Sequence, residues 1–219
     1  PSMVPPQKKS IDVQAVLELA TINKSFGKIS LFRKDRIVQA ANQVSFKVAP
    51  GETLGVVGES GSGKSTVARC AIRLIEPDSG RILVNDTDIA KLRESGLRHL
   101  RREIQIVFQD PYRSLNPRRT VGQSIVEGPM NFGQTEEVAV KKAKGLMEIV
   151  GLKPDNFNRF PHQFSGGQRQ RISIARALIC RPSFIVADEA VAALDVSIQA
   201  EILDLMKELQ KELGLTILF

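Results

Sequence analysis

Apolar positions along the chain follow two periods, and their order predicts an α/β domain. Apolar and polar residues alternate over Ala15–Ile22, as in a half-buried strand, and Val38–Val48 is a second strand region. Short apolar runs predict buried strands at Thr53–Val57 and Phe184–Ala187. Three further strand candidates are Ile82–Val84, Ile104–Phe108 and Leu215–Phe219.

Helical patterns lie between these strands. Apolar residues recur at helical spacing in Val138–Val150 and in Val196–Leu213, so both segments are predicted to be amphipathic helices. Residues 110–165 contain no apolar strand run, which predicts a helical subdomain over about residues 110–170, inserted in the α/β core. The remaining predicted helices are Lys64–Ile75, Arg93–Arg102 and Gln168–Ile179.

The composition of the chain limits the class of protein and the cellular compartment in which it is expected to lie. Residues 1–10 are polar and contain prolines, so we predict a disordered tail followed by one domain over residues 11–219. No run approaches the ~20 apolar residues of a membrane-spanning helix, and the N-terminus has no signal-peptide core. Cys70 and Cys180 show no metal or CxxC spacing, so we predict buried thiols in a reducing compartment.

The formal net charge is +7, which favours attraction to polyphosphate, nucleic acid or anionic lipid. The basic residues are scattered, however, and solvated surface charge explains any single cluster equally simply. The chain has one Tyr and no Trp, so the stacking aromatics of a single-strand binder are lacking.

One Gly-rich segment carries the clearest chemistry. It matches G-x-x-x-x-G-K-[ST] and lies between an apolar strand and a helix, where backbone N–H groups can surround phosphate oxygens. Glycines allow the required backbone, Lys64 supplies charge to the β- and γ-phosphates, and the Ser65 hydroxyl can reach Mg²⁺. The residues expected to bind phosphate are Gly58, Glu59, Ser60, Gly61, Ser62, Gly63, Lys64, Ser65 and Thr66.

Two acidic residues follow the apolar run Phe184–Ala187. A buried strand would place both carboxylates at its C-terminal end, where open α/β sheets bind ligands. We expect Asp188 to hold Mg²⁺ and Glu189 to orient and deprotonate an attacking water. Alone, the acidic pair is weak evidence for a catalytic site, because many strands end in acidic residues at the surface. Its occurrence together with the Gly-rich loop makes the evidence stronger.

A second candidate anion site lies before the predicted helix Gln168–Ile179. Ser165 is a suitable N-cap, and Gly166 and Gly167 expose backbone N–H groups at the helix N-terminus. The residues alone leave two interpretations open, an anion site or a plain helix cap.

Together these segments resemble an ABC-family nucleotide-binding domain, with a P-loop NTPase (RecA-like) core and an N-terminal antiparallel β region. The resemblance covers nearly the whole chain. The matching motifs are Walker A (Gly58–Thr66), the Q-loop (Val107–Pro111), the signature (Ser165–Gln168, after Phe164), Walker B (Phe184–Asp188, then Glu189) and the D-loop (Ala193–Asp195).

The resemblance implies a mechanism in which two domains enclose two ATP molecules, with Mg²⁺ as the metal. Gln109 is then expected to contact Mg²⁺ and the attacking water, and Asp195 to lie at the nucleotide interface. The signature of one domain faces Walker A of the other, so Ser165, Gly166, Gly167 and Gln168 act in trans. Phe26 could stack on adenine or be a core Phe near a strand end; the two alternatives stay open.

A narrower resemblance, to oligopeptide/dipeptide and nickel importer ATPases, rests on Phe108–Arg118, Phe164–Arg171 and Ala193–Ala200, with a possible loop at Ile29–Arg36. It implies a peripheral subunit on the cytoplasmic face of a bacterial inner membrane that powers uptake of peptides or similar solutes. The implied partners are transmembrane permease subunits, a second ABC ATPase subunit and, indirectly, a solute-binding protein; no nucleic acid is expected.

The sequence departs from the family pattern in two places. Ala190 and Ala192 replace the usual Pro and Ser, which removes a possible cross-dimer hydrogen bond of about 1 kcal/mol. The sequence also ends at Phe219, before the family's switch histidine, so we expect a C-terminally truncated cassette that binds ATP but hydrolyses it poorly.

Three other functions are weighed against an importer ATPase. A soluble ABC ATPase acting on nucleic acid or ribosomes fits the charge, but such proteins usually carry a coiled-coil insertion between Walker A and the signature. A degenerate cassette that only binds nucleotide is opposed, for the parent protein, by the presence of Lys64 and Glu189, and this alternative stays open for the truncated chain. A P-loop kinase or GTPase leaves the signature segment unexplained.

Overall fold

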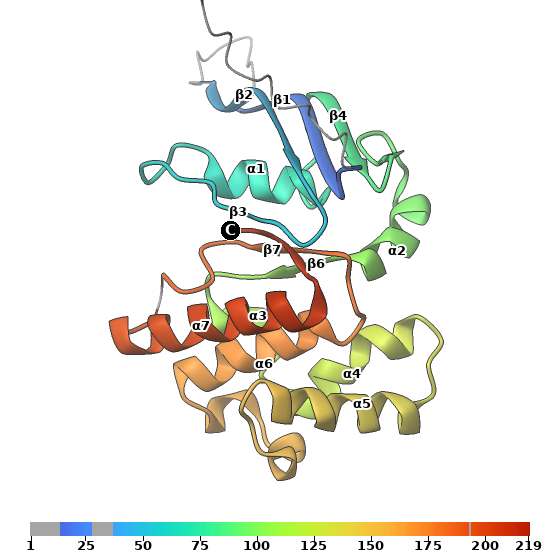
Figure 1. Cartoon of the computed structure of the whole chain (residues 1–219), viewed down its shortest axis with the longest axis vertical. Coiled ribbons are helices and arrows are strands. Elements are labelled where there is room, and N and C mark those ends of the chain that lie inside the picture. The colour runs from blue at the N-terminus through green and yellow to red at the C-terminus, as the bar shows by residue number, and fades with distance from the viewer. Residues whose placement is uncertain (1–13, 28–36, 193) are drawn as a thin grey trace, which may run out of the picture.

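The computed structural model describes residues 14–27, 37–192 and 194–219, which contain two four-stranded sheets with helices beside them (Figure 1). The predicted tail of residues 1–10, the loop Ile29–Arg36 and Ala193 of the D-loop lie outside the described residues. The α/β class with an N-terminal antiparallel region is confirmed.

The first sheet is antiparallel and has the order β2-β1-β4-β5. Its long strands are β1 (Leu17–Phe26) and β2 (Val38–Val48), and the others are β4 (Ser79–Val84) and β5 (Thr87–Asp88). The predicted strand Ala15–Ile22 ends too early, because β1 extends to Phe26. The strand continues because Phe26 pairs with Val38 and the Asp78 carboxylate accepts hydrogen bonds from Lys24 and Ser25.

The second sheet is parallel and has the order β3-β8-β7-β6. It consists of β3 (Thr53–Leu54), β6 (Ile104–Val107), β7 (Phe184–Ala187) and β8 (Thr216–Leu218). In β7, Phe184 and Val186 join one hydrophobic cluster, while Ile185 and Ala187 join the other. Both faces of β7 are therefore buried, which explains its continuous apolar sequence.

The prediction of a buried strand over Thr53–Val57 was wrong. Strand β3 comprises only Thr53 and Leu54, the Val56 N–H still donates to the Phe219 carbonyl, and Val57 is 95% exposed. Among the described residues, β3 lies at the end of the strand order and pairs with β8. An apolar run does not distinguish an edge strand from a central strand, because burial depends on neighbours distant in sequence.

Helix α1 (Lys64–Ala71) lies between the two sheets in Figure 1. Its Val67, Cys70 and Ala71 are buried in the cluster that also contains residues of both sheets. The helix ends before the predicted Ile75, because Arg73 adopts a left-handed φ of 55° while its side chain donates to the Ile89 and Leu92 carbonyls.

Helix α2 (Glu94–Glu103) packs in the same cluster as α1, through Leu97. The other helices pack on the opposite face of the parallel sheet (Figure 1). They are α3 (Pro111–Ser114), α4 (Val121–Asn131), α5 (Glu136–Ile149), α6 (Gly166–Leu178) and α7 (Val196–Leu213), with 3₁₀ turns at Pro154–Asn158 and Pro161–Gln163. None of the described helices combines the length and apolar character needed to cross a membrane.

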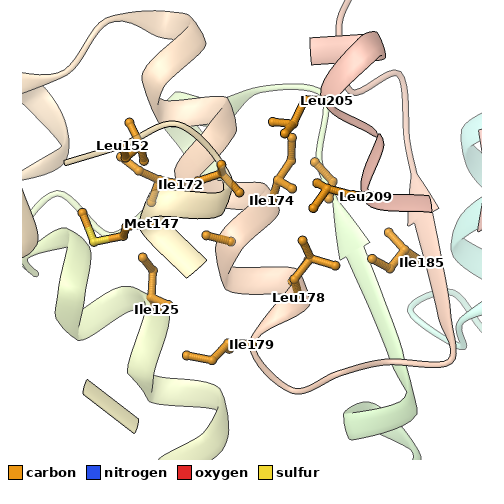
Figure 2. Packing of buried hydrophobic residues seen from close by; sticks show 14 of the residues in the cluster. Ile125, Met147, Leu152, Ile172, Ile174, Leu178, Ile179, Ile185, Leu205 and Leu209 are labelled. Atoms are coloured by element: carbon orange, nitrogen blue, oxygen red, sulfur yellow. The ribbon is translucent and has the colours of Figure 1, made fainter. Parts of the chain in front are cut away.

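Helix α6 lies at the centre of the hydrophobic cluster on the face of the parallel sheet opposite α1. Figure 2 shows Ile172, Ile174 and Leu178 of α6 between residues of α4 and α5 on one side and of α7 and β7 on the other. The packing links the helical region to the strand that precedes Asp188. Cys180 belongs to the same cluster, and both cysteines are buried as predicted.

Candidate nucleotide-binding site

The candidate site lies at the C-terminal ends of the parallel strands. The loop after β3 leads to α1, and Asp188 and Glu189 follow β7 directly. Lys64, Ser65, Asp188 and Glu189 all line one cavity of about 110 Å³, together with apolar residues that include Phe219. The structure thus brings the Gly-rich loop and the acidic pair together, although they are distant in sequence.

The glycines of the loop have different roles. Gly61 and Gly63 have φ values of 81° and 95°, which side chains disfavour. At Gly63 a Cβ would also lie 1.9 Å from the Ala40 carbonyl oxygen of β2, so this position is closed to any side chain. The expectation of a special backbone at Gly58 was wrong: its φ is not positive, and an added Cβ would instead approach Ser62 Oγ to 2.8 Å.

Lys64 is held close to the loop. Its Nζ donates hydrogen bonds of 2.8 Å to the Gly58 and Glu59 carbonyl oxygens and lies 4.0 Å from Glu189 Oε1. The loop carbonyls and Glu189 therefore hold this ammonium group beside the cavity. An incoming polyphosphate would offer stronger, charged acceptors at the same place.

The two acids have different environments. Asp188 is buried and its backbone N–H donates to the Val107 carbonyl, which extends the pairing of β7 with β6. Glu189 has a left-handed φ of 48°, an uncommon conformation for a residue with a side chain, and its side chain is 37% exposed. Strained backbone of this kind is concentrated at functional sites.

The cavity suits Mg²⁺ better than a structural metal. Within the described ranges, no group of three or more His, Cys, Asp or Glu residues could hold a metal ion. Ser65 and Asp188 provide one hydroxyl and one buried carboxylate. This small oxygen set fits Mg²⁺, which keeps several waters and binds through one or two protein groups plus phosphate oxygens.

Gln109 lies in a second, larger cavity of about 920 Å³. This cavity is lined by residues after β6, by α4 and α6, and by Arg69 of α1. Arg69, which the sequence patterns did not indicate as a site residue, forms an ion pair with Asp188. A signal was available, because Arg69 is four positions beyond Ser65 and therefore lies on the same face of a helix.

Phe26 at the end of β1 is 44% exposed, so the core alternative for this ring does not hold. Lys24 Nζ lies 5.5 Å from the ring centroid and donates to Asp78 Oδ1 at 2.7 Å. This hydrogen bond lowers the pKa of Asp78, which also accepts from the Ser25 N–H. The strand end that presents Phe26 is thereby fixed.

The signature residues form the predicted helix start. Ser165 is the N-cap of α6, its Oγ accepts from the Gln168 N–H, and the Gln168 side chain completes a capping box. Gly166 and Gly167 lie against Leu194 and Ile198. Ser165 and Asp195, the N-cap of α7, are both exposed. Neither is among the described residues that line the cavity at Lys64.

Two residues after the signature also escaped the sequence analysis. Arg169 is buried, donates to the Pro161 carbonyl at 2.7 Å and stacks 3.7 Å from the Tyr112 ring centroid. Gln170 is buried and donates to the Ala190 carbonyl at 2.6 Å. The start of α6 is therefore tied both to the segment after Gln109 and to the segment after Glu189.

A Gly-rich loop before a helix, facing two acids at the end of a parallel strand, defines a P-loop nucleotide-binding domain. The family model described as ABC transporter matches residues 41–192, and the chain belongs to this family.

Curated relatives of the chain include transporter ATP-binding proteins. It is 55% identical over 188 residues to the probable peptide ABC transporter ATP-binding protein y4tS of Sinorhizobium fredii, covering 84% of this chain and 52% of that protein. It is 52% identical to a putative peptide import ATP-binding protein of Brucella ovis (81% and 56% covered) and to the glutathione import protein GsiA of Pectobacterium atrosepticum (86% and 30%). The chain therefore spans about half, or less, of these relatives' length.

Solved structures of related cassettes share the fold. The dimeric post-hydrolysis state of MJ0796 bound to ADP and Pi matches with a TM-score of 0.81 at 30% identity, covering 92% of this chain and 86% of that one. The CbiO1 protein of Clostridium perfringens, part of the transporter complex CbiONQ, matches with a TM-score of 0.78 at 30% identity, covering 94% and 77%.

Proposed function

We propose that this chain is the ATP-binding and ATP-hydrolysing subunit of an importer that moves peptides or similar small solutes through a membrane permease. One observation carries the ATP part of the proposal: Lys64, Ser65, Asp188 and Glu189 line a single cavity beside the Gly-rich loop. The solute class is supported by the relatives, whose names specify peptide or glutathione import.

The geometry supports a role for each of these residues. The loop N–H groups and the N-terminus of α1 bind the phosphates, and Lys64 exchanges its two carbonyl acceptors for phosphate oxygens. Ser65 and Asp188 hold Mg²⁺, which would neutralise charge on the β- and γ-phosphates. Glu189, at the rim of the cavity, orients the attacking water and accepts its proton. Phe26, exposed at its strand end, is available to stack on adenine.

We further propose that two cassettes cooperate. Ser165 caps a helix whose free N–H groups suit an anion, yet it is exposed and away from the cavity of its own chain. A second ATPase subunit would supply this helix start in trans, beside Asp195. A single copy would then hydrolyse ATP slowly, because its nucleotide is contacted from one side only.

We also propose where in the cell the chain acts. The chain would bind a permease peripherally at the cytoplasmic face of a bacterial inner membrane, with a solute-binding protein as an indirect partner. No nucleic-acid partner is proposed. Between Gly58 and Ser165, the described helices are short, the longest being α5 (Glu136–Ile149), and none forms a coiled-coil arm.

Transport in proteoliposomes tests this proposal. With a permease and a solute-binding protein that assemble with the chain, a labelled oligopeptide should enter vesicles only when the chain and ATP are both on the cassette side. Replacing Lys64 by Ala should stop uptake. ATP-independent uptake, or binding of the chain to DNA that weakens steeply with salt, would contradict the importer function.

A further inference from the structure

The Asp188 carboxylate has one side-chain partner among the described residues, Arg69 of α1. Both Nε and Nη2 of Arg69 lie 2.9 Å from the same oxygen, Asp188 Oδ2. The Asp188 side chain is 3% exposed, whereas that of Arg69 is 41% exposed. The negative charge of the nearly buried Asp188 carboxylate is therefore neutralised by the guanidinium group of Arg69, whose side chain is partly exposed to solvent.

This arrangement leaves the other carboxylate oxygen free of protein hydrogen bonds in the described part of the chain. One hydrogen bond from Nε and a second charged contact from Nη2 both fall on Oδ2, while Oδ1 keeps its full capacity as a ligand. Asp188 and Ser65 line the same cavity, so this capacity is available where Mg²⁺ is proposed to bind.

The sequence of α1 produces this geometry. Ser65 and Arg69 are four residues apart and project from one face of the helix. Ser65 lines the cavity at Lys64, whereas Arg69 lines the larger cavity that contains Gln109. One helix therefore carries a metal-ligand hydroxyl and, one turn further, a guanidinium that contacts the metal-ligand carboxylate.

We infer that Arg69 is a positioning residue for the metal site, which fixes Asp188 through Oδ2 and leaves Oδ1 to bind Mg²⁺. The inference rests on the proposed function, because it requires that Asp188 holds the metal of MgATP. Groups that orient a metal ligand from behind usually change metal affinity by about tenfold to a hundredfold when removed. Arg69 should therefore affect the metal contribution to nucleotide affinity, and not the phosphate contacts of the loop.

Calorimetry with a non-hydrolysable ATP analogue measures this contribution. The affinity of the chain for the analogue is measured in EDTA and again in excess Mg²⁺. The ratio of the affinity in Mg²⁺ to the affinity in EDTA is called the metal effect. Arg69→Gln should reduce the metal effect by about tenfold, while the affinity in EDTA changes by less than about twofold. Arg98→Gln removes an exposed arginine from a neighbouring helix and should leave both values unchanged.

The conservative variant gives a second readout. Arg69→Lys keeps the charge of the pair but cannot place two nitrogens against Oδ2 in a fixed plane, so it should recover part of the metal effect. Arg69→Lys also tests the inference if Arg69→Gln does not fold, because the lysine keeps a positive charge beside the buried Asp188 carboxylate.

An unchanged metal effect in Arg69→Gln, or equal losses in EDTA and in Mg²⁺, would overturn the inference, as would full recovery by Arg69→Lys. If Arg69→Gln does not fold, an unchanged metal effect in Arg69→Lys overturns it. Failure of the proposed function has a different signature, since the unmodified chain would then bind the analogue under neither condition.

Discussion

Replacing Glu189 by Gln is expected to lower ATP turnover by about a thousandfold while ATP affinity stays within about twofold. Gln has nearly the same shape as Glu but cannot accept a proton from water at neutral pH. Glu189 lines the cavity 4.0 Å from Lys64, so the substitution removes the base without removing a phosphate contact. Phosphate release under single-turnover conditions and calorimetric ATP binding measure the two quantities separately.

A matched control separates this effect from the loss of any surface charge. Glu201→Gln also removes a carboxylate that is paired with a cation, since Glu201 Oε2 lies 3.1 Å from Arg171 Nη2, but this pair joins α7 to α6 and neither residue lines the cavity. It should not change turnover measurably, because surface ion pairs contribute little. Normal turnover in Glu189→Gln, or an equal loss in Glu201→Gln, would contradict the proposed role of Glu189.

Replacing Lys64 by Ala is expected to weaken ATP binding by about a hundredfold, equivalent to about 3 kcal/mol. The ammonium group already makes two hydrogen bonds to loop carbonyls at the cavity, and phosphate oxygens would replace these acceptors. In Lys64→Ala the phosphates lose this charged donor, and calorimetry with MgATP measures the difference.

The control for Lys64 is Lys141→Ala, which removes an exposed ammonium group from α5. Thermal unfolding of both variants should match that of the unmodified chain, because neither side chain belongs to a hydrophobic cluster. Unchanged affinity in Lys64→Ala would show that nucleotide binds elsewhere.

Local sequence signals predicted the parts of the site whose geometry is set by near neighbours. The four apolar residues Phe184–Ala187 predicted a buried strand, and burial on both faces confirms it. Ser165 followed by Gln168 predicted a helix cap, and both hydrogen bonds of the capping box are present. In each case the pattern and the structure that it specifies lie within a few residues.

Distant contacts explain what the sequence did not predict. The exposure of Val57 follows from the edge position of β3, which depends on where β8 lies in the sheet. The pair of Arg69 with Asp188 joins residues 119 positions apart. The positions of Gln109 and Ser165, outside the cavity at Lys64, likewise depend on how the helical region packs against the parallel sheet.

The central claim is that ATP binds at the loop Gly58–Thr66 beside Asp188 and Glu189. Hydrogen–deuterium exchange with and without MgATP tests it most directly, because the loop amides are proposed to donate to phosphate. If ATP binds there, exchange should be slower in residues 58–66 and 188–189, with the exposed face of α7 unchanged. Unaltered exchange in residues 58–66 at saturating MgATP, with protection in another segment, would contradict it.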